Sequence, residues 1–176
     1  MKNIILYGFM GTGKTTVGRM LATKSGSAFI DTDAEIVKRQ GMSIPDIFAT
    51  RGEEYFRQCE AELVQELAGK RGTIISTGGG TMRNPANVAA LHGSGIVVYL
   101  VADVDTILAR TQKQGERPVL DRASRQTGSR RAGIEQLIAE RRAMYESVNP
   151  DLTVDTSNMT PLEIVTKILS YAKSHR

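Results

Sequence analysis

The chain has 176 residues and one cysteine, Cys59, so it forms no internal disulfide, and its length suits a single domain, residues 1–176, with its own core. It is 40% hydrophobic and 24% charged, with no apolar run long enough to span a bilayer, so we expect no membrane partner. The apolar first residues lead directly into a glycine-rich motif rather than a cleavage site, which predicts a cytoplasmic location.

The net charge of +4 is concentrated in one segment. Residues 110–131 contain seven basic and two acidic residues, while the remainder of the chain is close to neutral. A compact cationic segment suits a small polyanion such as a nucleoside triphosphate better than an extended duplex. We therefore expect no nucleic-acid partner.

Short apolar runs and helical spacing alternate along the chain. Runs rich in β-branched residues predict strands at 3–8, 28–31, 73–77, 95–101 and 152–156. Amphipathic spacing predicts helices at 14–24, 34–50, 53–69, 84–92, 103–111, 132–147 and 160–173. This alternation is typical of a three-layer α/β/α fold with a five-stranded parallel sheet, which binds ligands at the carboxyl ends of its strands.

The first loop, "GFMGTGKTT" at 8–16, fits the phosphate-binding pattern G-x-x-x-x-G-K-[ST] between a predicted strand and a predicted helix. Its glycines let backbone N–H groups turn toward a diphosphate, and the helix presents its positive end. We expect Lys14 to neutralise the β- and γ-phosphates and Thr15 to ligate Mg²⁺. The predicted ATP-binding residues here are Gly11, Thr12, Gly13, Lys14, Thr15 and Thr16. A glycine-rich turn without a ligand is the alternative.

Two aspartates follow the second predicted strand, in "FIDTD". If the chain stays extended, Asp31 and Asp33 lie on one side of it, about 6.6 Å apart at roughly 3.3 Å per residue, which leaves room for a hydrated metal ion. We expect Asp31 to hold Mg²⁺ through a water and Asp33 to meet a substrate hydroxyl. The alternative is that Asp33 caps a helix beginning at Ala34.

A second glycine cluster, "TGGG" at 77–80, follows the third predicted strand. Ser76 stands where many nucleoside triphosphatases carry an aspartate, and the chain has no N-K-x-D motif, so a GTPase is disfavoured. Bare backbone at a strand end favours a small, closely packed substrate. The alternative is a tight turn before a helix near Asn84.

The chain resembles the shikimate kinase family over essentially its whole length. The resemblance rests on "GFMGTGKTT", on "DTD" followed by "SIPDIFATRGEEYFR", on "STGGGT", on "RPVL" at 117–120, and on "RRAMY" at 141–145 ahead of "VDTS". It implies a P-loop kinase fold with substrate-binding helices at about 34–69 and a mobile lid at about 111–133. It also implies transfer of the γ-phosphoryl group of ATP to the 3-hydroxyl of shikimate, with Mg²⁺, in the pathway to chorismate and the aromatic amino acids.

The resemblance also implies roles for individual residues. Asp33 hydrogen-bonds the accepting hydroxyl and takes its proton, and Lys14 and Arg117 complete the catalytic set. Arg57 and Arg141 clamp the substrate carboxylate. The substrate also meets backbone at Gly78, Gly79 and Gly80. Arg117 is the lid arginine over the phosphates, Arg110 contacts the nucleotide, and we expect a monomer.

The chain departs from the family pattern at three places. "RRAMY" replaces the family's R-x-P-L-Y, so Arg142 competes with Arg141, which we favour because it lies four residues before the tyrosine. The lid stretch 121–133 is longer and more basic than in relatives. Asn158 and Met159 stand where relatives carry a basic residue near the adenine, so we assign them no role.

Two other functions stay open. One is a different small-metabolite kinase of the same architecture, acting on gluconate or a nucleoside monophosphate. The other is a non-catalytic nucleotide switch whose cationic segment binds an acidic partner. Turnover with a panel of acceptors separates all of these hypotheses.

Overall fold

The sheet has five parallel strands in the order β2-β3-β1-β4-β5. The computed structural model describes residues 1–113 and 117–175. The strands are β1 (Asn3–Tyr7), β2 (Ala28–Asp31), β3 (Thr73–Ser76), β4 (Gly95–Val101) and β5 (Leu152–Asp155). Because β1 is central, the loop that follows it opens in the middle of the sheet's carboxyl edge, where such folds bind ligands.

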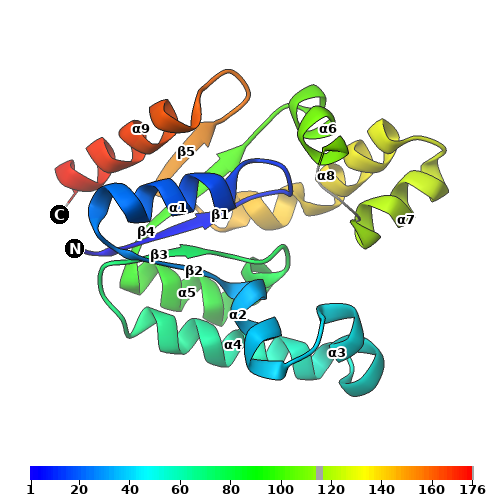
Figure 1. The fold of residues 1–176 in the computed structure, drawn as a ribbon, viewed down its shortest axis with the longest axis horizontal. Helices are drawn as coiled ribbons and strands as arrows, with labels where there is room; N and C mark the ends of the chain where they lie inside the picture. The colour runs from blue at the N-terminus through cyan, green and yellow to red at the C-terminus, as the bar shows by residue number, and fades with distance from the viewer. Residues whose placement is uncertain (114–116, 176) are drawn as a thin grey trace.

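Helices cover both faces of this sheet, as Figure 1 shows. They are α1 (Lys14–Ser25), α2 (Thr32–Gln40), α3 (Ile44–Arg51), α4 (Glu53–Ala68), α5 (Pro85–Ser94), α6 (Val104–Gln112), α7 (Pro118–Thr127), α8 (Arg130–Ser147) and α9 (Pro161–Ser174), with a 3₁₀ turn, η1, at Thr81–Arg83. Helices α1 and α9 lie on one face, and α4 and α5 lie on the other. The prediction of a three-layer α/β/α fold with five parallel strands is confirmed.

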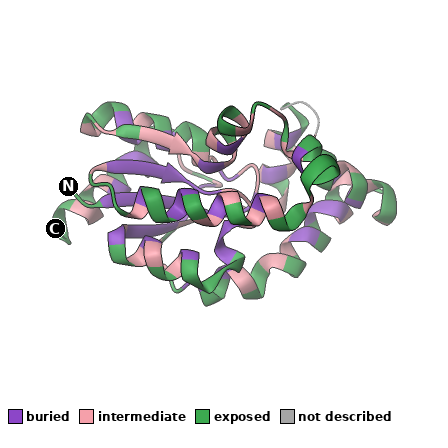
Figure 2. Ribbon diagram, turned by 90° about the horizontal axis from the view of Figure 1, so that it is seen from below, coloured by how far each residue is buried: buried purple, intermediate pink, exposed green. Residues whose placement is uncertain are grey.

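The three central strands, β1, β3 and β4, are mostly buried on both faces, and Figure 2 shows buried residues in the middle of the sheet, whereas the edge strands β2 and β5 are partly exposed. Along β1, Ile4 and Leu6 belong to the core beneath α1 and α9, whereas Ile5 and Tyr7 belong to the core beneath α4 and α5. Successive side chains of a strand point to opposite faces, so a doubly covered strand must be apolar throughout. This explains why the strand runs do not alternate between apolar and polar residues.

The single helix predicted over 34–50 is wrong. Gly41, at φ 66°, ends α2, and the Ser43 side chain accepts a hydrogen bond from the Asp46 N–H to begin α3. The apolar spacing continues across this break because Ile36 and Ile47 reach the same core. Periodicity alone therefore did not reveal the turn, although Gly41, Ser43 and Pro45 are ordinary helix stop and start signals.

The segment predicted as a lid is mostly helical where the structure describes it, with a break between α7 and α8 at Gly128 and Ser129. Helix α7 buries Leu120 and Ala123 and packs along α8. The part at 114–116 lies outside the described residues, and movement of the lid stays a prediction. Figure 1 shows α7 and α6 on one side of the sheet's carboxyl edge and α2 and α3 on the other. None of the helices in residues 1–113 and 117–175 has the length and hydropathy to cross a membrane.

Candidate active site

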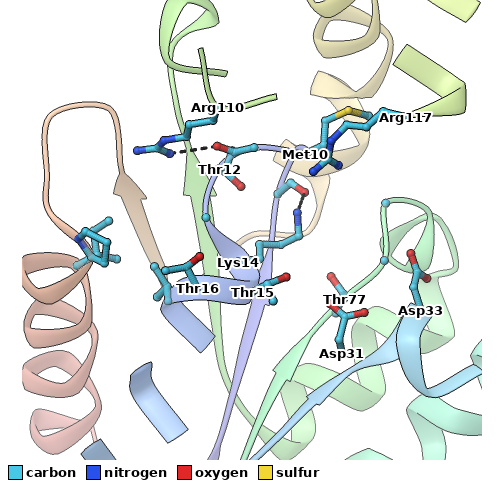
Figure 3. Close-up of a pocket in the computed structure, with 18 of the residues that line it drawn as sticks. Met10, Thr12, Lys14, Thr15, Thr16, Asp31, Asp33, Thr77, Arg110 and Arg117 are labelled. Carbon is cyan, nitrogen blue, oxygen red and sulfur yellow. Dashed lines mark hydrogen bonds between the residues drawn. The ribbon is translucent and has the colours of Figure 1, made fainter. Parts of the chain in front are cut away.

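A cavity of about 890 Å³ lies at the carboxyl ends of the strands. Its wall comes from the P-loop, the β2–α2 junction, the glycine loop after β3, α6, the start of α7, α8 and the start of α9. The lining includes the predicted residues Gly11, Thr12, Gly13, Lys14, Thr15, Thr16, Asp31, Asp33, Gly78, Gly79, Arg110, Arg117 and Arg141. In Figure 3, Arg110 and Asp33 lie on opposite sides of Lys14.

The P-loop holds its lysine with its own backbone. Lys14 Nζ donates to the carbonyl oxygens of Gly8 at 2.7 Å and Phe9 at 3.0 Å. Gly8, at φ 143°, leaves no room for a side chain, since a Cβ atom there would overlap the Leu100 carbonyl. Burial lowers the pKa of Lys14 to about 8, although Asp31 and Asp33 oppose this effect. The ammonium is thus a half-buried cation beside two carboxylates.

The structure corrects the prediction for the two aspartates. Helix α2 begins at Thr32, and Asp31 is its N-cap, with Oδ1 accepting the Ala34 N–H at 3.1 Å. The alternative that Asp33 caps this helix is therefore wrong, as is the expectation that both aspartates lie on extended chain. Asp33 lies in the first turn of α2, and both carboxylates line the cavity.

Asp33 is a half-buried carboxyl with a raised pKa. Burial is the main cause, with repulsion from Asp31 and Glu60 adding to it, while Lys14 and Arg57 act in the opposite direction. The net result is a pKa of about 6. At neutral pH the group is therefore mostly ionised, yet it accepts a proton more readily than an exposed aspartate does.

Each glycine of the 78–80 loop lies against a different predicted side chain. A Cβ atom at Gly78 would overlap the Asp33 carboxylate, and one at Gly80 would overlap the Arg57 guanidinium. At Gly79 it would come within 3.0 Å of Arg141 Nη1. The predicted turn is also present, since η1 follows and the Asn84 side chain caps α5. The 78–80 loop is thus a turn, and its backbone also lies against the Asp33 carboxylate and the Arg57 and Arg141 guanidinium groups, which come from three different helices.

Glu60 is a residue of this site that sequence reasoning missed. It is 2% exposed, its Oε1 accepts from Arg57 Nη1 at 3.0 Å, and its Oε2 accepts from the Thr81 hydroxyl at 2.7 Å. Arg57 also bonds Glu53 at 3.3 Å and lies over the Phe56 ring. The spacing of three residues between Arg57 and Glu60 on one helix was an available signal. Its meaning depends on burial, which the sequence did not show.

The structure separates the two candidate arginines of α8. Arg141 lines the cavity, and its guanidinium lies 5.6 Å from the centre of the Phe9 ring. Arg142 has a 71% exposed side chain and lies 3.9 Å from Glu146. It lines a separate hollow of about 230 Å³. Neighbouring residues on a helix point about 100° apart, so only one of the two shares the cavity with Asp33.

The two arginines predicted to contact the nucleotide, Arg110 and Arg117, are anchored in different ways. Arg110 donates to the Gly11 carbonyl at 3.1 Å and to the Thr156 carbonyl at 2.8 Å, which ties the P-loop to the end of β5. The Arg117 backbone N–H donates to Asp121 Oδ2 at 2.9 Å. Asp121 Oδ1 is bonded to Arg130 at 3.1 Å. The start of α7 is thus tied to the start of α8. Cavity-lining residues outside the predicted set include Met10, Val119, Met159, Pro161 and Ile164.

The donors present fit a magnesium ion that takes most of its ligands from phosphate and water. Residues 1–113 and 117–175 contain no group of three or more His, Cys, Asp or Glu side chains that would hold a metal by itself. Thr15 and Asp31 both line the cavity, and Asp31 has Oδ2 left when Oδ1 caps α2. One hydroxyl and one carboxylate match the sparse protein ligation that Mg²⁺ usually has beside nucleotides.

Comparisons with known proteins agree with this geometry. The family model described as shikimate kinase matches residues 10–173. A shikimate kinase from Pelotomaculum thermopropionicum is 45% identical over 99% of this chain and 98% of its own. A structure of the Acinetobacter baumannii shikimate kinase in complex with shikimate is 36% identical, with a TM-score of 0.85, covering 100% of this chain and 95% of its own.

A more distant match limits what the fold alone implies. A gluconokinase structure from Sinorhizobium meliloti is similar at a TM-score of 0.61 and 18% identity, over 99% of this chain and 93% of its own. At that identity the likeness concerns the fold only. Because the family model spans nearly the whole chain and relatives reach 45% identity, the chain belongs to the shikimate kinase family.

Proposed function

We propose that the cavity transfers the γ-phosphoryl group of ATP to the 3-hydroxyl of shikimate, giving shikimate 3-phosphate and ADP. The observation that carries the proposal is the convergence of Asp33, Arg57 and Arg141 on the 78–80 loop, beside Lys14 of the P-loop. Membership of the shikimate kinase family supports it, as does the likeness to a relative that binds shikimate.

Arg57 and Arg141 would hold the substrate carboxylate. Planar guanidinium groups bind carboxylates through paired donors, and both of these are already oriented, Arg57 by Glu60 and Arg141 by the Phe9 ring. The hydroxyl-bearing ring would then lie against the bare backbone of 78–80. This arrangement directs one hydroxyl toward Asp33.

Asp33 would act on the accepting hydroxyl. As the hydroxyl oxygen bonds to the γ-phosphorus, its proton passes to the Asp33 carboxylate, and the bond to the β–γ bridging oxygen breaks to release ADP. A pKa of about 6 suits this task, because the group is ionised at neutral pH and still basic enough to take the proton.

Lys14 and Arg117 would stabilise the charge on the transferred group. Phosphoryl transfer places charge on the equatorial oxygens, so fixed cations supply much of the rate enhancement. The phosphates would replace the Gly8 and Phe9 carbonyls as partners of Lys14. Thr15 and Asp31 would hold Mg²⁺, which neutralises phosphate charge when bound. Arg110, which lines the cavity and is bonded to the Gly11 and Thr156 carbonyls, would contact the nucleotide.

The lid, at about 111–133, would close over the bound substrates. Closure would exclude water, which competes with shikimate as phosphoryl acceptor. The protein would act as a monomer in the cytoplasm. No nucleic-acid partner is needed, since the basic residues at 110 and 117 line the nucleotide side of the cavity.

A coupled assay of ADP release tests the proposal. The purified chain should turn over ATP with shikimate and not with gluconate or AMP, and removal of Mg²⁺ by EDTA should abolish turnover. Mass spectrometry should identify shikimate 3-phosphate. Lys14→Ala should be inactive, whereas Lys24→Ala, at the exposed end of the same helix, should keep full activity. Turnover with gluconate or AMP but not with shikimate would overturn the assignment.

A further inference from the structure

Thr32, the residue between the two aspartates, makes a buried contact that no catalytic role explains. It is the first residue of α2 and is 0% exposed. Its hydroxyl oxygen accepts a hydrogen bond from the Gly78 N–H at 2.9 Å, across 46 residues of sequence. The bond joins the turn that carries Asp31 and Asp33 to the glycine loop.

This bond acts at the place where the loop must be held most closely. Gly78 lies so near the Asp33 carboxylate that a single added carbon would overlap it. On its other side the loop is anchored through Thr77, whose N–H donates to the Leu6 carbonyl at 3.0 Å. At the far end of the loop, Thr81 is bonded to Glu60. Residues 78–80 are glycines, so the loop has no side chains of its own that could fix its position.

We propose that Thr32 is a positioning residue for the substrate-binding loop. Its hydroxyl fixes the position of the Gly78 backbone relative to the Asp33 carboxylate. The loop that contacts the ring hydroxyls and the carboxylate that accepts the proton are thereby held in one fixed arrangement. The inference rests on the proposed function for its substrate but concerns a residue outside the set that touches shikimate. Thr32 acts through Gly78.

Thr32→Val tests the proposal, because it keeps the shape of the side chain and removes the acceptor. The Gly78 N–H then lies part-buried without a partner, and the KM for shikimate should rise about tenfold. The KM for ATP should change by less than about twofold, since Lys14 and the P-loop are untouched. Thr32→Ser restores the acceptor and should recover most of the affinity for shikimate.

Thr73→Val is the matched control. Thr73 is 4% exposed and begins β3, at the opposite end of the strand from the glycine loop. The same substitution there removes a buried hydroxyl without touching the cavity, and both KM values should stay near wild type. A second measurement needs no variant: the Gly78 amide of the ¹⁵N-labelled wild-type protein should exchange slowly with solvent deuterium.

The outcomes separate this inference from the proposed function. If the wild-type chain does not phosphorylate shikimate, the proposed function fails. If it does, and Thr32→Val leaves the KM for shikimate unchanged or alters both KM values equally, the inference fails alone. Failure of Thr32→Ser to restore the affinity, or rapid exchange of the wild-type Gly78 amide, also overturns it.

Discussion

Arg57 Nη1 lies 3.0 Å from Oε1 of Glu60, a carboxylate that is 2% exposed and also accepts the Thr81 hydroxyl. The pair fixes the direction of a guanidinium that lies against Gly80 and belongs to a side chain that is 33% exposed. A buried carboxylate is costly unless its oxygens are bonded, and the hydrogen bonds from Arg57 and Thr81 to Glu60 offset this cost while they hold the Arg57 guanidinium in place. The two residues act as one unit.

Replacing Glu60 should therefore weaken shikimate binding indirectly, through the position of Arg57, although Glu60 itself would not touch the substrate. In Glu60→Gln the negative charge that pairs with Arg57 is lost and only a hydrogen bond from the guanidinium to the amide oxygen can remain, so we expect the KM for shikimate to rise about tenfold or more, with the KM for ATP unchanged. Glu66→Gln on the same helix is the control, because Glu66 bonds Arg39 and Lys70 at the exposed surface. Steady-state kinetics measure both, and equal effects on both KM values would contradict the prediction.

The neighbouring arginines of α8 should behave differently. Arg141→Ala removes a cation beside Gly79, and the KM for shikimate should rise about 30-fold or more. Arg142→Ala removes an exposed side chain that only approaches Glu146, and kcat/KM should change by less than about twofold. Calorimetric titration with shikimate gives the same comparison at equilibrium. A larger loss in Arg142→Ala would reverse the assignment.

The glycine loop should not tolerate a methyl group. In Gly80→Ala the added methyl group pushes the Arg57 guanidinium aside. Moving this substrate-binding group out of place should lower kcat/KM for shikimate about 100-fold. Gly93→Ala in α5 is the control, because the added carbon meets no atom within 4 Å beyond its chain neighbours and the adjacent backbone of its own helix, and alanine favours helix. It should keep full activity and not lower the Tm. Wild-type kinetics in Gly80→Ala would show that the loop yields easily.

Asp33→Asn should lower the activity of the protein and raise the stability of its folded state. Loss of the proton acceptor should lower kcat about 10²- to 10⁴-fold. Folding raises the pKa of Asp33, so its ionised form destabilises the folded chain at neutral pH, and this penalty fades as the pH falls from about 6 to 3.8. The neutral amide escapes the penalty, and the Tm at pH 7 should rise by about 2–4 °C for each kcal/mol regained. A lower Tm would mean that attraction to Lys14 and Arg57 outweighs burial.

The pH dependence of the wild-type reaction should report the same group. With a pKa of about 6, Asp33 loses its basic form below that pH, and kcat/KM for shikimate should fall about tenfold for each further pH unit. Kinetics between pH 5 and 9 at constant ionic strength measure this limb. The residual activity of Asp33→Asn should lack it. An inflection near 4 would indicate an ordinary exposed aspartate.

The sequence by itself determined the features that depend on neighbours along the chain. A buried strand, a glycine-rich loop and a helix beginning at Lys14 follow one another directly along the chain, so the P-loop could be predicted from the local sequence. Doubly buried strands alternating with helices also predicted the three-layer fold. The motifs around Asp33, Arg57 and Gly79 indicated the family without any knowledge of their distances.

Only the tertiary structure decided how these parts meet. The order β2-β3-β1 sets the Asp33 turn, the glycine loop and the P-loop side by side, and long-range pairing of this kind leaves no local signal. Glu60 has a sequence context like that of any helical glutamate, and only its burial shows that it holds Arg57 in place. The orientation of α8 about its axis places Arg141, and not Arg142, in the cavity. Backbone hydrogen bonding made Asp31, not Asp33, the cap of α2. Each outcome depends on what surrounds a side chain in space, which packing alone defines.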